Sequence, residues 1–169
     1  AVLDLHDVVH ESVRLVRRAI PENIELSVDV PPGLHVFGES TQLMQVILNL
    51  VINARDAIGA NRSGHIEIRG APSWDEIVLQ IRDDGCGMGL EVRTRLFEPF
   101  FTTKGAKGNG IGLASVREIV HNHGGGVDVE STPGLGTIIA VRLPAEPEAP
   151  QSGRRDTPRR DAVPTARSS

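Results

Sequence analysis

The alternation of apolar and polar residues predicts one long amphipathic helix near the middle of the chain, over residues 41–58. Apolar residues recur there at helical spacing, and polar residues follow a second stripe. The apolar stripe comprises Leu43, Val46, Ile47, Leu50, Ala54 and Ala57, and the polar stripe comprises Gln42, Gln45, Asn49, Asn53 and Asp56. Asparagine costs up to about 0.7 kcal/mol relative to alanine inside a helix. Two asparagines one turn apart therefore indicate either the solvated side of a surface helix or a binding site, and the helix alone favours the first.

The rest of the chain shows two further helical patterns and six strand patterns. Helices are expected over residues 4–20 and 111–123, and strands over residues 24–30, 35–37, 66–71, 77–83, 127–131 and 137–143. Glu39, Ser40 and Thr41 are candidates for the N-terminal cap of the central helix. Residues 84–110 are rich in glycine and contain only a helical turn or two near residues 91–97. A loop of this length in a compact domain indicates a functional lid.

Strands that alternate irregularly with three helices predict an α+β fold. We expect a two-layer sandwich in which a mixed, mostly antiparallel sheet is covered on one face by three helices. A doubly wound fold would need a helix between most strands, and the strand pairs within residues 66–83 and 127–143 lack one. After Pro144 the chain is rich in proline and arginine and almost free of aliphatic residues. Residues 1–144 are therefore predicted to form the domain, and residues 145–169 a disordered tail or linker.

The amino-acid composition argues against several classes of function. The chain of 169 residues carries a net charge of -4 and only 3% aromatic residues, so we expect no nucleic-acid binding. Its single cysteine, Cys86, excludes an internal disulfide. Neither an apolar run of membrane-spanning length nor a secretory leader is present, so we expect a cytoplasmic chain without direct membrane contact.

Three glycine clusters carry the candidate chemistry. They lie at residues 83–89 after a predicted strand, at residues 108–112 before a predicted helix, and at residues 134–137 before the last strand. Glycines at the start of a helix let backbone N–H groups approach a phosphate. The glycine offsets do not fit a Rossmann fingerprint, and no P-loop motif occurs. Each cluster taken singly could also be a simple turn.

The order of the motifs is more specific than any one of them. The asparagine helix is followed by Asp-x-Gly-x-Gly at residues 83–87, by Leu-Phe-Glu-Pro-Phe-Phe-Thr-Thr-Lys at residues 96–104, and by Gly-x-Gly-x-Gly-Leu at residues 108–113. This order resembles the N, G1, F and G2 boxes of the ATP-binding catalytic domain of sensor histidine kinases, in the GHKL superfamily. The resemblance covers roughly residues 1–144 and implies a Bergerat-type ATP-binding fold. The amino-acid sequence of these motifs is similar to that of the nitrogen-regulation and PAS-linked branch.

The resemblance implies a role for each motif residue. Asn53 would give its amide oxygen to Mg²⁺, and Asp83 would accept a hydrogen bond from the adenine amino group of ATP. Gly85 and Gly87 would let the backbone pass close to the base, and Thr137 would stand beside the aspartate. The lid residues implied to contact or shape the phosphate end are Lys104, Lys107, Gly108, Gly110, Gly112 and Leu113. Either lysine could instead be solvated.

Two positions on the central helix depart from relatives in the superfamily. In the related ATPases, the residue one turn before the magnesium asparagine is a glutamate that activates water. Asn49 stands there in this chain, and an amide cannot accept that proton, so slow hydrolysis is expected. Asp56 stands where several kinase branches have a phosphate-binding lysine. The phosphate charge must then be met by the ion, by the lid lysines or by helix termini.

The phosphoaccepting histidine is not found in this chain. His6 and His10 lack the proline and basic residues of a histidine box and lie too close to the asparagine helix. Residues 1–20 are therefore expected to be a helix leading in from a dimerisation domain outside the chain. The resemblance implies phosphoryl transfer to a histidine of that domain in the same parent protein, and then to a response regulator receiver domain. It further implies a monomeric isolated domain and a homodimeric parent.

Two alternatives remain open on the sequence. One is a GHKL-type ATPase whose lid closure drives a clamp, which Asn49 disfavours. The other is a degenerate module that binds nucleotide or a partner through the surface around Phe97, Phe100 and Phe101, which concentrate three of the four phenylalanines.

Overall fold

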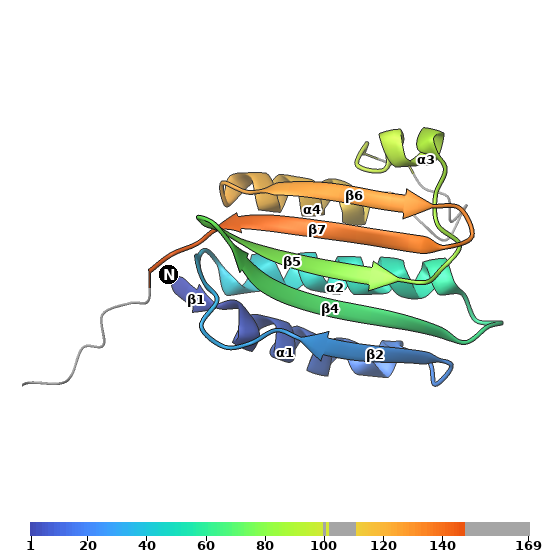
Figure 1. Cartoon of the computed structure of the whole chain (residues 1–169), viewed down its shortest axis with the longest axis horizontal. Helices are drawn as coiled ribbons and strands as arrows, with labels where there is room; N and C mark the ends of the chain where they lie inside the picture. The colour runs from blue at the N-terminus through green and yellow to red at the C-terminus, as the bar shows by residue number, and fades with distance from the viewer. Residues whose placement is uncertain (100, 102–110, 148–169) are drawn as a thin grey trace, which may run out of the picture.

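The computed structural model describes residues 1–99, 101 and 111–147 (Figure 1). Its elements in chain order are β1 (Val2–Asp4), α1 (Leu5–Val16), the short 3-10 helix η1 (Arg17–Ala19), β2 (Ile24–Asp29), β3 (His35–Phe37), α2 (Ser40–Ile58), β4 (Gly64–Ser73), β5 (Glu76–Asp83), α3 (Leu90–Arg95), α4 (Ile111–Asn122), β6 (Gly126–Thr132) and β7 (Gly136–Pro144). The central helix, the β4–β5 hairpin and the final strand pair therefore form where the sequence pattern predicts them.

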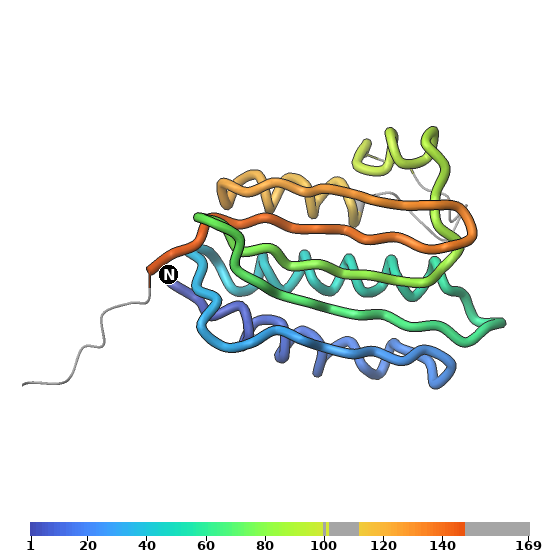
Figure 2. Tube along the Cα trace, viewed as in Figure 1, coloured from blue at the N-terminus to red at the C-terminus, as the bar shows by residue number. Residues whose placement is uncertain are grey.

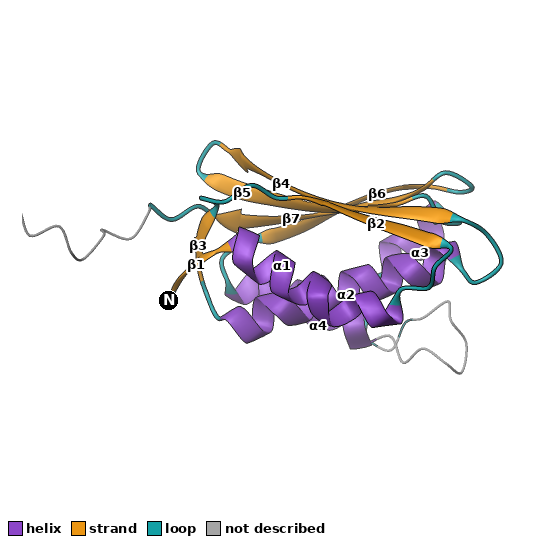
Figure 3. Ribbon diagram, turned by 90° about the horizontal axis from the view of Figure 1, so that it is seen from below, coloured by secondary structure: helices purple, strands orange, loops and turns teal. Residues whose placement is uncertain are grey.

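Five strands form one sheet in the order β2-β4-β5-β7-β6. Strand β2 runs parallel to β4, and the other neighbouring pairs are antiparallel. Strands β1 and β3 form a separate antiparallel pair at one end of the domain. Helices α1, α2 and α4 cover one face of the five-stranded sheet (Figure 3). This arrangement confirms the predicted two-layer α+β sandwich.

The core lies between the helices and the sheet, and it is almost entirely aliphatic. Its largest fully buried side chains are Leu5, Ile47, Leu50, Ile66, Ile68, Leu79, Ile81, Val9, Val36, Val46, Val51 and Val116. Burial of one such side chain stabilises the fold by roughly 1.5–3 kcal/mol. On β5, Ile77, Leu79 and Ile81 point into this core, and the same alternation brings Asp83 to the helical side at the end of the strand.

The predicted N-terminal helix is shorter than expected. Residues 2–4 form β1, which pairs with β3, and the helix begins only at Leu5. Asp4 caps it, because its carboxylate accepts a hydrogen bond from the His6 backbone N–H at 3.0 Å. The α-helix ends at Val16 and continues as a 3-10 turn before Pro21. Val2 and Leu3 are consecutive apolar residues without polar alternation, so β1 shows no strand pattern of its own.

The two described ends of the chain meet at one end of the domain (Figure 2). The backbone N–H of Gly38 donates to the carbonyl of Ala1, and Ala145 forms a bridge with Val36. The N–H of Glu146 also donates to the His35 carbonyl at 2.9 Å. The domain therefore extends at least two residues past the predicted boundary at Pro144. Residues 148–169, most of the predicted tail, lie outside the described residues.

The central helix begins without the side-chain cap that the sequence suggested. Glu39 occupies the N-cap position, and its side chain makes no capping hydrogen bond. Its backbone N–H instead donates to Nε2 of His123, at the end of α4, at 3.2 Å. The Nδ1 atom of His123 lies 2.7 Å from the Ile119 carbonyl, so Nδ1 is the donor of this contact. Across the described residues, no helix is long and apolar enough to cross a bilayer.

Candidate functional site

The candidate site forms where the last turns of α2 meet the end of β5 and the start of β7 (Figure 1). Asn49, Asn53 and Ala57 follow one another at intervals of four residues, so they form one ridge along α2. The first of them contacts α4 and the third contacts the loop after β5. Asn53 therefore lies between these two contacts, on the side of α2 where they are made, and it is half-buried.

Asp83 is the buried acid of this site. Its side chain faces the helices at the end of β5, and the residue is only 6% exposed. Desolvation by burial raises the pKa of Asp83 to about 6, although the backbone N–H groups of Gly85 and Thr137 favour the carboxylate. The Gly85 N–H donates to Oδ1 at 2.9 Å. At neutral pH the group is a carboxylate that offers hydrogen-bond acceptors inside the domain.

Two hydroxyl groups extend the polar surface beside this aspartate. Thr137 is paired with Asp83 across the β5–β7 ladder and is 5% exposed. Its Oγ1 lies 2.8 Å from Oγ of Ser131, which donates to the Gly136 carbonyl at 3.1 Å. The same Ser131 oxygen accepts from the Met88 backbone N–H at 2.8 Å. The sequence had drawn attention to Thr137 but not to Ser131, which no glycine motif marks.

The glycine loop after β5 packs directly on the end of α2. The Cys86 N–H donates to the Ala57 carbonyl at 3.0 Å. Gly87 has φ +67, and a Cβ there would overlap the Thr132 carbonyl. The loop is therefore held between the end of α2 and the β6–β7 turn, and the predicted approach of Gly85 and Gly87 to a base stays a prediction.

Asn49 does not point freely into solvent. Its Nδ2 donates to the carbonyl of Gly112, in the first turn of α4, at 3.3 Å. The amide nitrogen thus ties the middle of α2 to the start of α4. Leu113, the next residue, packs against the hydrophobic core and is only partly buried. Gly112, one of the predicted phosphate-end residues that the structure describes, thus contacts the asparagine ridge.

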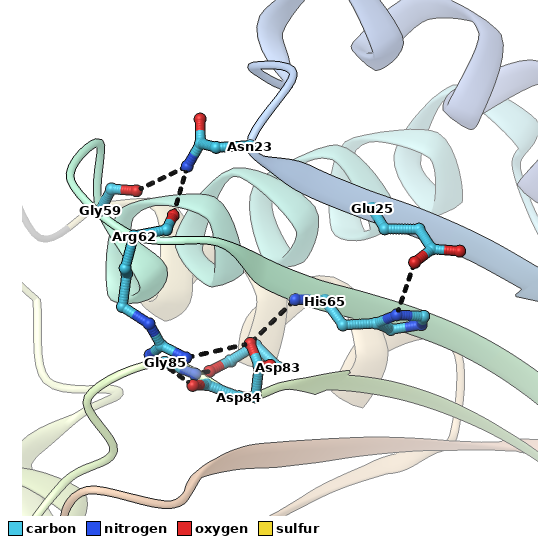
Figure 4. Close-up of polar contacts among 8 residues, drawn as sticks. All are labelled: Asn23, Glu25, Gly59, Arg62, His65, Asp83, Asp84 and Gly85. Carbon is cyan, nitrogen blue, oxygen red and sulfur yellow. Dashed lines mark hydrogen bonds and ion pairs between the residues drawn. The ribbon is translucent and has the colours of Figure 1, made fainter.

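A second layer of polar contacts surrounds the Asp83 turn (Figure 4). Oδ1 of Asp84 accepts from the His65 backbone N–H at 2.9 Å. Arg62 donates to the Asp84 carbonyl at 2.6 Å, and its guanidinium lies 3.8 Å from the Asp84 carboxylate. Nδ2 of Asn23 in turn donates to the Arg62 carbonyl at 2.6 Å. Arg62, Asn23 and His65 carried no signal in the sequence.

The predicted phenylalanine cluster is divided in the structure. The Arg117 guanidinium of α4 lies 6.0 Å from the centre of the half-buried Phe97 ring. Phe97 lines a groove of about 590 Å³ with α4 residues and with Gly126 and Val127 of β6. The Phe101 ring instead packs against Arg95 at 4.6 Å. Phe100, Lys104, Lys107, Gly108 and Gly110 lie outside the described residues.

The described donors fit an adenine nucleotide with a magnesium ion. Asp83 presents a carboxylate that can accept from an exocyclic amino group, and the Gly85 N–H holds that carboxylate in place. Magnesium needs only one or two protein oxygens when phosphates supply others, and Asn53 offers one amide oxygen. Among the described residues, no three histidine, cysteine, aspartate or glutamate side chains gather into a group able to hold a metal ion. Asn53 would therefore be one ligand of an ion whose other ligands are phosphate and water oxygens.

Comparison with known proteins connects these features to one family. Residues 38–147 match the family described as Histidine kinase-, DNA gyrase B-, and HSP90-like ATPase. The C4-dicarboxylate transport sensor protein DctB of Rhizobium meliloti (strain 1021) is 39% identical over 141 residues, which cover 82% of this chain and 22% of DctB. The sensor histidine kinase ZraS of Klebsiella oxytoca is 39% identical over 145 residues, which cover 84% of this chain and 31% of ZraS. The chain thus spans less than a third of either relative.

Solved structures show the same fold. The mycobacterial sensor histidine kinase MprB superposes with a TM-score of 0.77 and 32% identity, covering 87% of this chain and 98% of the MprB chain. The histidine kinase ThkA, in complex with the response regulator protein TrrA, superposes with a TM-score of 0.72 and 27% identity. That match covers 88% of this chain and 42% of the ThkA chain.

Proposed function

This chain belongs to the family of histidine kinase-, DNA gyrase B- and HSP90-like ATPases, and we propose that it provides the ATP-binding catalytic domain of a sensor histidine kinase. In this proposal it transfers the γ-phosphoryl group of ATP to a histidine on a dimerisation domain outside the chain. One observation supports this proposal most directly. The loop that follows the buried Asp83 packs on the Asn49–Asn53–Ala57 ridge of α2, where the Cys86 N–H donates to the Ala57 carbonyl. One nucleotide could bridge these two elements.

Asp83 and its neighbours would bind the base. The carboxylate accepts from the adenine amino group, and guanine, which lacks an amino group at that ring position, is disfavoured because a buried acceptor would lose its partner. Thr137 and Ser131 supply hydroxyl groups beside it. Gly85 and Gly87 hold this loop against α2 and the β6–β7 turn, and in this proposal its main chain passes close to the ring. Selectivity for adenine would therefore come from the end of β5 and the start of β7.

Asn53 and Asn49 would act at the phosphate end. The Asn53 amide oxygen would hold Mg²⁺, which neutralises phosphate charge when the nucleotide is bound. Asn49 cannot accept a proton, so it cannot activate water as a general base. Its hydrogen bond to Gly112 would fix the start of α4 relative to the metal ligand. Lys104, Lys107, Gly108, Gly110 and Leu113 complete the proposed set, and the chemistry would rest on positioning and charge.

The partners of the proposed reaction lie outside this chain. A histidine-containing dimerisation domain of the same parent protein would receive the phosphoryl group and then pass it to a response regulator receiver domain. The solved complex of ThkA with the response regulator TrrA supports the second partner. We place the reaction in the cytoplasm, where ATP is available, with a monomeric isolated domain inside a homodimeric parent. The amino-acid sequence of residues 49–57 and 98–104 supports assignment to the nitrogen-regulation and PAS-linked branch.

Three measurements on the full chain test this function. Calorimetric titration with ATP and Mg²⁺ should show binding, and GTP should bind much more weakly. Incubation with labelled ATP and a separately supplied histidine-containing dimerisation domain should transfer label to the histidine. Steady-state hydrolysis should be slow; rapid turnover without an acceptor would favour the clamp ATPase. Absence of nucleotide binding would favour a degenerate module that binds partners through the groove beside Phe97.

A further inference from the structure

We propose that Arg62, in the loop between α2 and β4, is a positioning residue that orients the peptide group holding the Asp83 carboxylate, with Asp84 as its counter-charge. This inference rests on the proposed adenine contact of Asp83. It concerns residues that contact neither the base nor the phosphates in that proposal. Figure 4 shows the arrangement, with Arg62 reaching from its loop to the Asp84–Gly85 turn.

The geometry centres on a single peptide group. The carbonyl of Asp84 and the N–H of Gly85 belong to the same planar unit, so fixing one fixes the other. The Arg62 guanidinium donates to that carbonyl at 2.6 Å, and the Gly85 N–H donates to Oδ1 of Asp83 at 2.9 Å. A donor at the carbonyl also polarises the N–H on the opposite side of the peptide group. Arg62 therefore acts on Asp83 through one peptide group.

Arg62 is itself held in place from both sides. Nδ2 of Asn23 donates to the Arg62 carbonyl at 2.6 Å and to the Gly59 carbonyl at 3.4 Å, which fixes the loop after α2. At the other end, the Asp84 carboxylate lies 3.8 Å from the guanidinium and accepts from the His65 N–H. An arginine whose backbone and head group are both anchored is better suited to positioning than a freely solvated one.

Charge gives the same residues a measurable signature. The positive charge of Arg62 lowers the pKa of Asp83 and the negative charge of Asp84 raises it, while burial, the largest cause, holds it near 6. In the described part of the chain, the groups that the other packed elements place around this turn are neutral: the Ala57 main chain of α2 beside Gly85, and Thr137 of β7, which pairs with Asp83 and contacts Ser131 of β6. Removing Arg62 and neutralising Asp84 should therefore shift the titration of Asp83 in opposite directions.

The test measures ATP affinity of the full chain by calorimetry between pH 5 and pH 8. Affinity of the unaltered chain should fall as the pH drops through the range in which Asp83 gains a proton. Arg62→Ala should bind ATP about three- to tenfold more weakly at pH 7.5, the effect of losing one partly exposed hydrogen bond. The midpoint of the change in its ATP affinity with pH should move to higher pH. Arg62→Lys should recover part of both effects, because it keeps the charge and one donor.

Asp84→Asn keeps an oxygen for the His65 N–H but removes the negative charge, so its midpoint should move to lower pH. The matched control is Arg69→Ala, which removes an arginine of β4 that pairs with Asp29 and Glu67. It should change neither affinity nor midpoint. The phosphate groups of ATP titrate equally in every comparison, so differences between variants belong to the protein. A general loss of folding would lower affinity without opposite shifts of the midpoint.

The outcomes separate this inference from the function on which it rests. Unchanged midpoints in Arg62→Ala and Asp84→Asn, with a normal pH profile in the unaltered chain, would overturn the positioning role and leave the adenine contact standing. Unchanged ATP affinity in Asp83→Asn would overturn the adenine contact itself. Opposite shifts with partial recovery in Arg62→Lys are the expected result.

Discussion

Gly85 lies so close to Ala57 that a Cβ atom at position 85 would stand 2.6 Å from the Ala57 carbonyl carbon and 2.7 Å from its oxygen. Real side chains do not approach backbone this closely, so the loop after β5 and the end of α2 fit together only with glycine at this position. The same Cβ would stand 2.8 Å from Oδ1 of Asp83. The steric requirement at Gly85 therefore sets the position of the proposed adenine-binding carboxylate as well.

Replacing Gly85 by alanine should separate the loop from α2. We expect Gly85→Ala to lower the free energy of unfolding by about 1–3 kcal/mol, the usual result of overpacking. ATP affinity should fall by at least about tenfold, because the hydrogen bond from Cys86 to Ala57 and the position of Asp83 are both disturbed. Urea unfolding and calorimetric titration measure the two effects. Gly89→Ala is the control, since a Cβ there meets nothing within 4 Å.

Asp83→Asn should separate binding from stability. Burial raises the pKa of Asp83 to about 6, so the folded state holds its proton to higher pH than the unfolded state does. Ionisation of Asp83 therefore opposes folding as the pH rises from the pKa of this group in the unfolded chain to its pKa of about 6 in the folded chain. The neutral asparagine avoids this penalty. At pH 7.5 the variant should gain up to roughly 2–3 kcal/mol in unfolding free energy, while ATP affinity falls by about ten- to a hundredfold.

The gain should shrink at pH 4, where Asp83 is protonated when folded. Thermal and urea unfolding at pH 4 and pH 7.5 provide the comparison, with Asp75→Asn at the exposed β4–β5 turn as a control that should change neither quantity. A variant that is less stable at pH 7.5, or that keeps its affinity, would contradict the assignment of Asp83 as a buried carboxylate held for binding.

Asn53→Ala should remove the metal-dependent part of nucleotide binding. The unaltered chain should bind ATP more tightly with Mg²⁺ than with a chelator present, and the variant should show about the same affinity in both conditions. We expect at least about a tenfold loss with Mg²⁺, since one ligand to a charged ion is removed. Gln45→Ala, at an exposed position of the same helix, should retain the difference. A preserved Mg²⁺ dependence in Asn53→Ala would assign the ion to other groups.

The two-layer α+β sandwich could be predicted from the sequence, whereas the strand order could not, and the proposed site residues stay a prediction. Helix α2 and strand β5 have strong periodicity, so both elements could be predicted from the sequence. The roles proposed for Asn53 and Asp83 came from the resemblance to sensor histidine kinases. Arg62 and Ser131 could not be named from the sequence, because a loop arginine and a strand serine gain their meaning only from the backbone atoms they contact. Strand β1 was missed because Val2 and Leu3 are both apolar and do not alternate with polar residues.

Asn49 leads to the last prediction, which concerns the choice between transfer and hydrolysis. Its side chain donates to the Gly112 carbonyl at 3.3 Å, and the amide leaves no base to activate water. Asn49→Glu and Asn49→Gln lengthen the side chain equally, but only glutamate can accept a proton. Both should weaken the contact with α4 and lower phosphoryl transfer to a supplied histidine domain.

Hydrolysis distinguishes the two variants. Asn49→Glu should raise steady-state ATP hydrolysis by at least about tenfold, a fraction of the 10²- to 10⁴-fold that a well-placed general base contributes. Asn49→Gln should leave hydrolysis as slow as in the unaltered chain, measured as phosphate released over time at saturating ATP. Equal rates in the two variants would mean that geometry at the start of α4, rather than the missing base, limits attack by water. The glutamate variant should also work best above the pKa of its new carboxyl group, because only the ionised form accepts the proton.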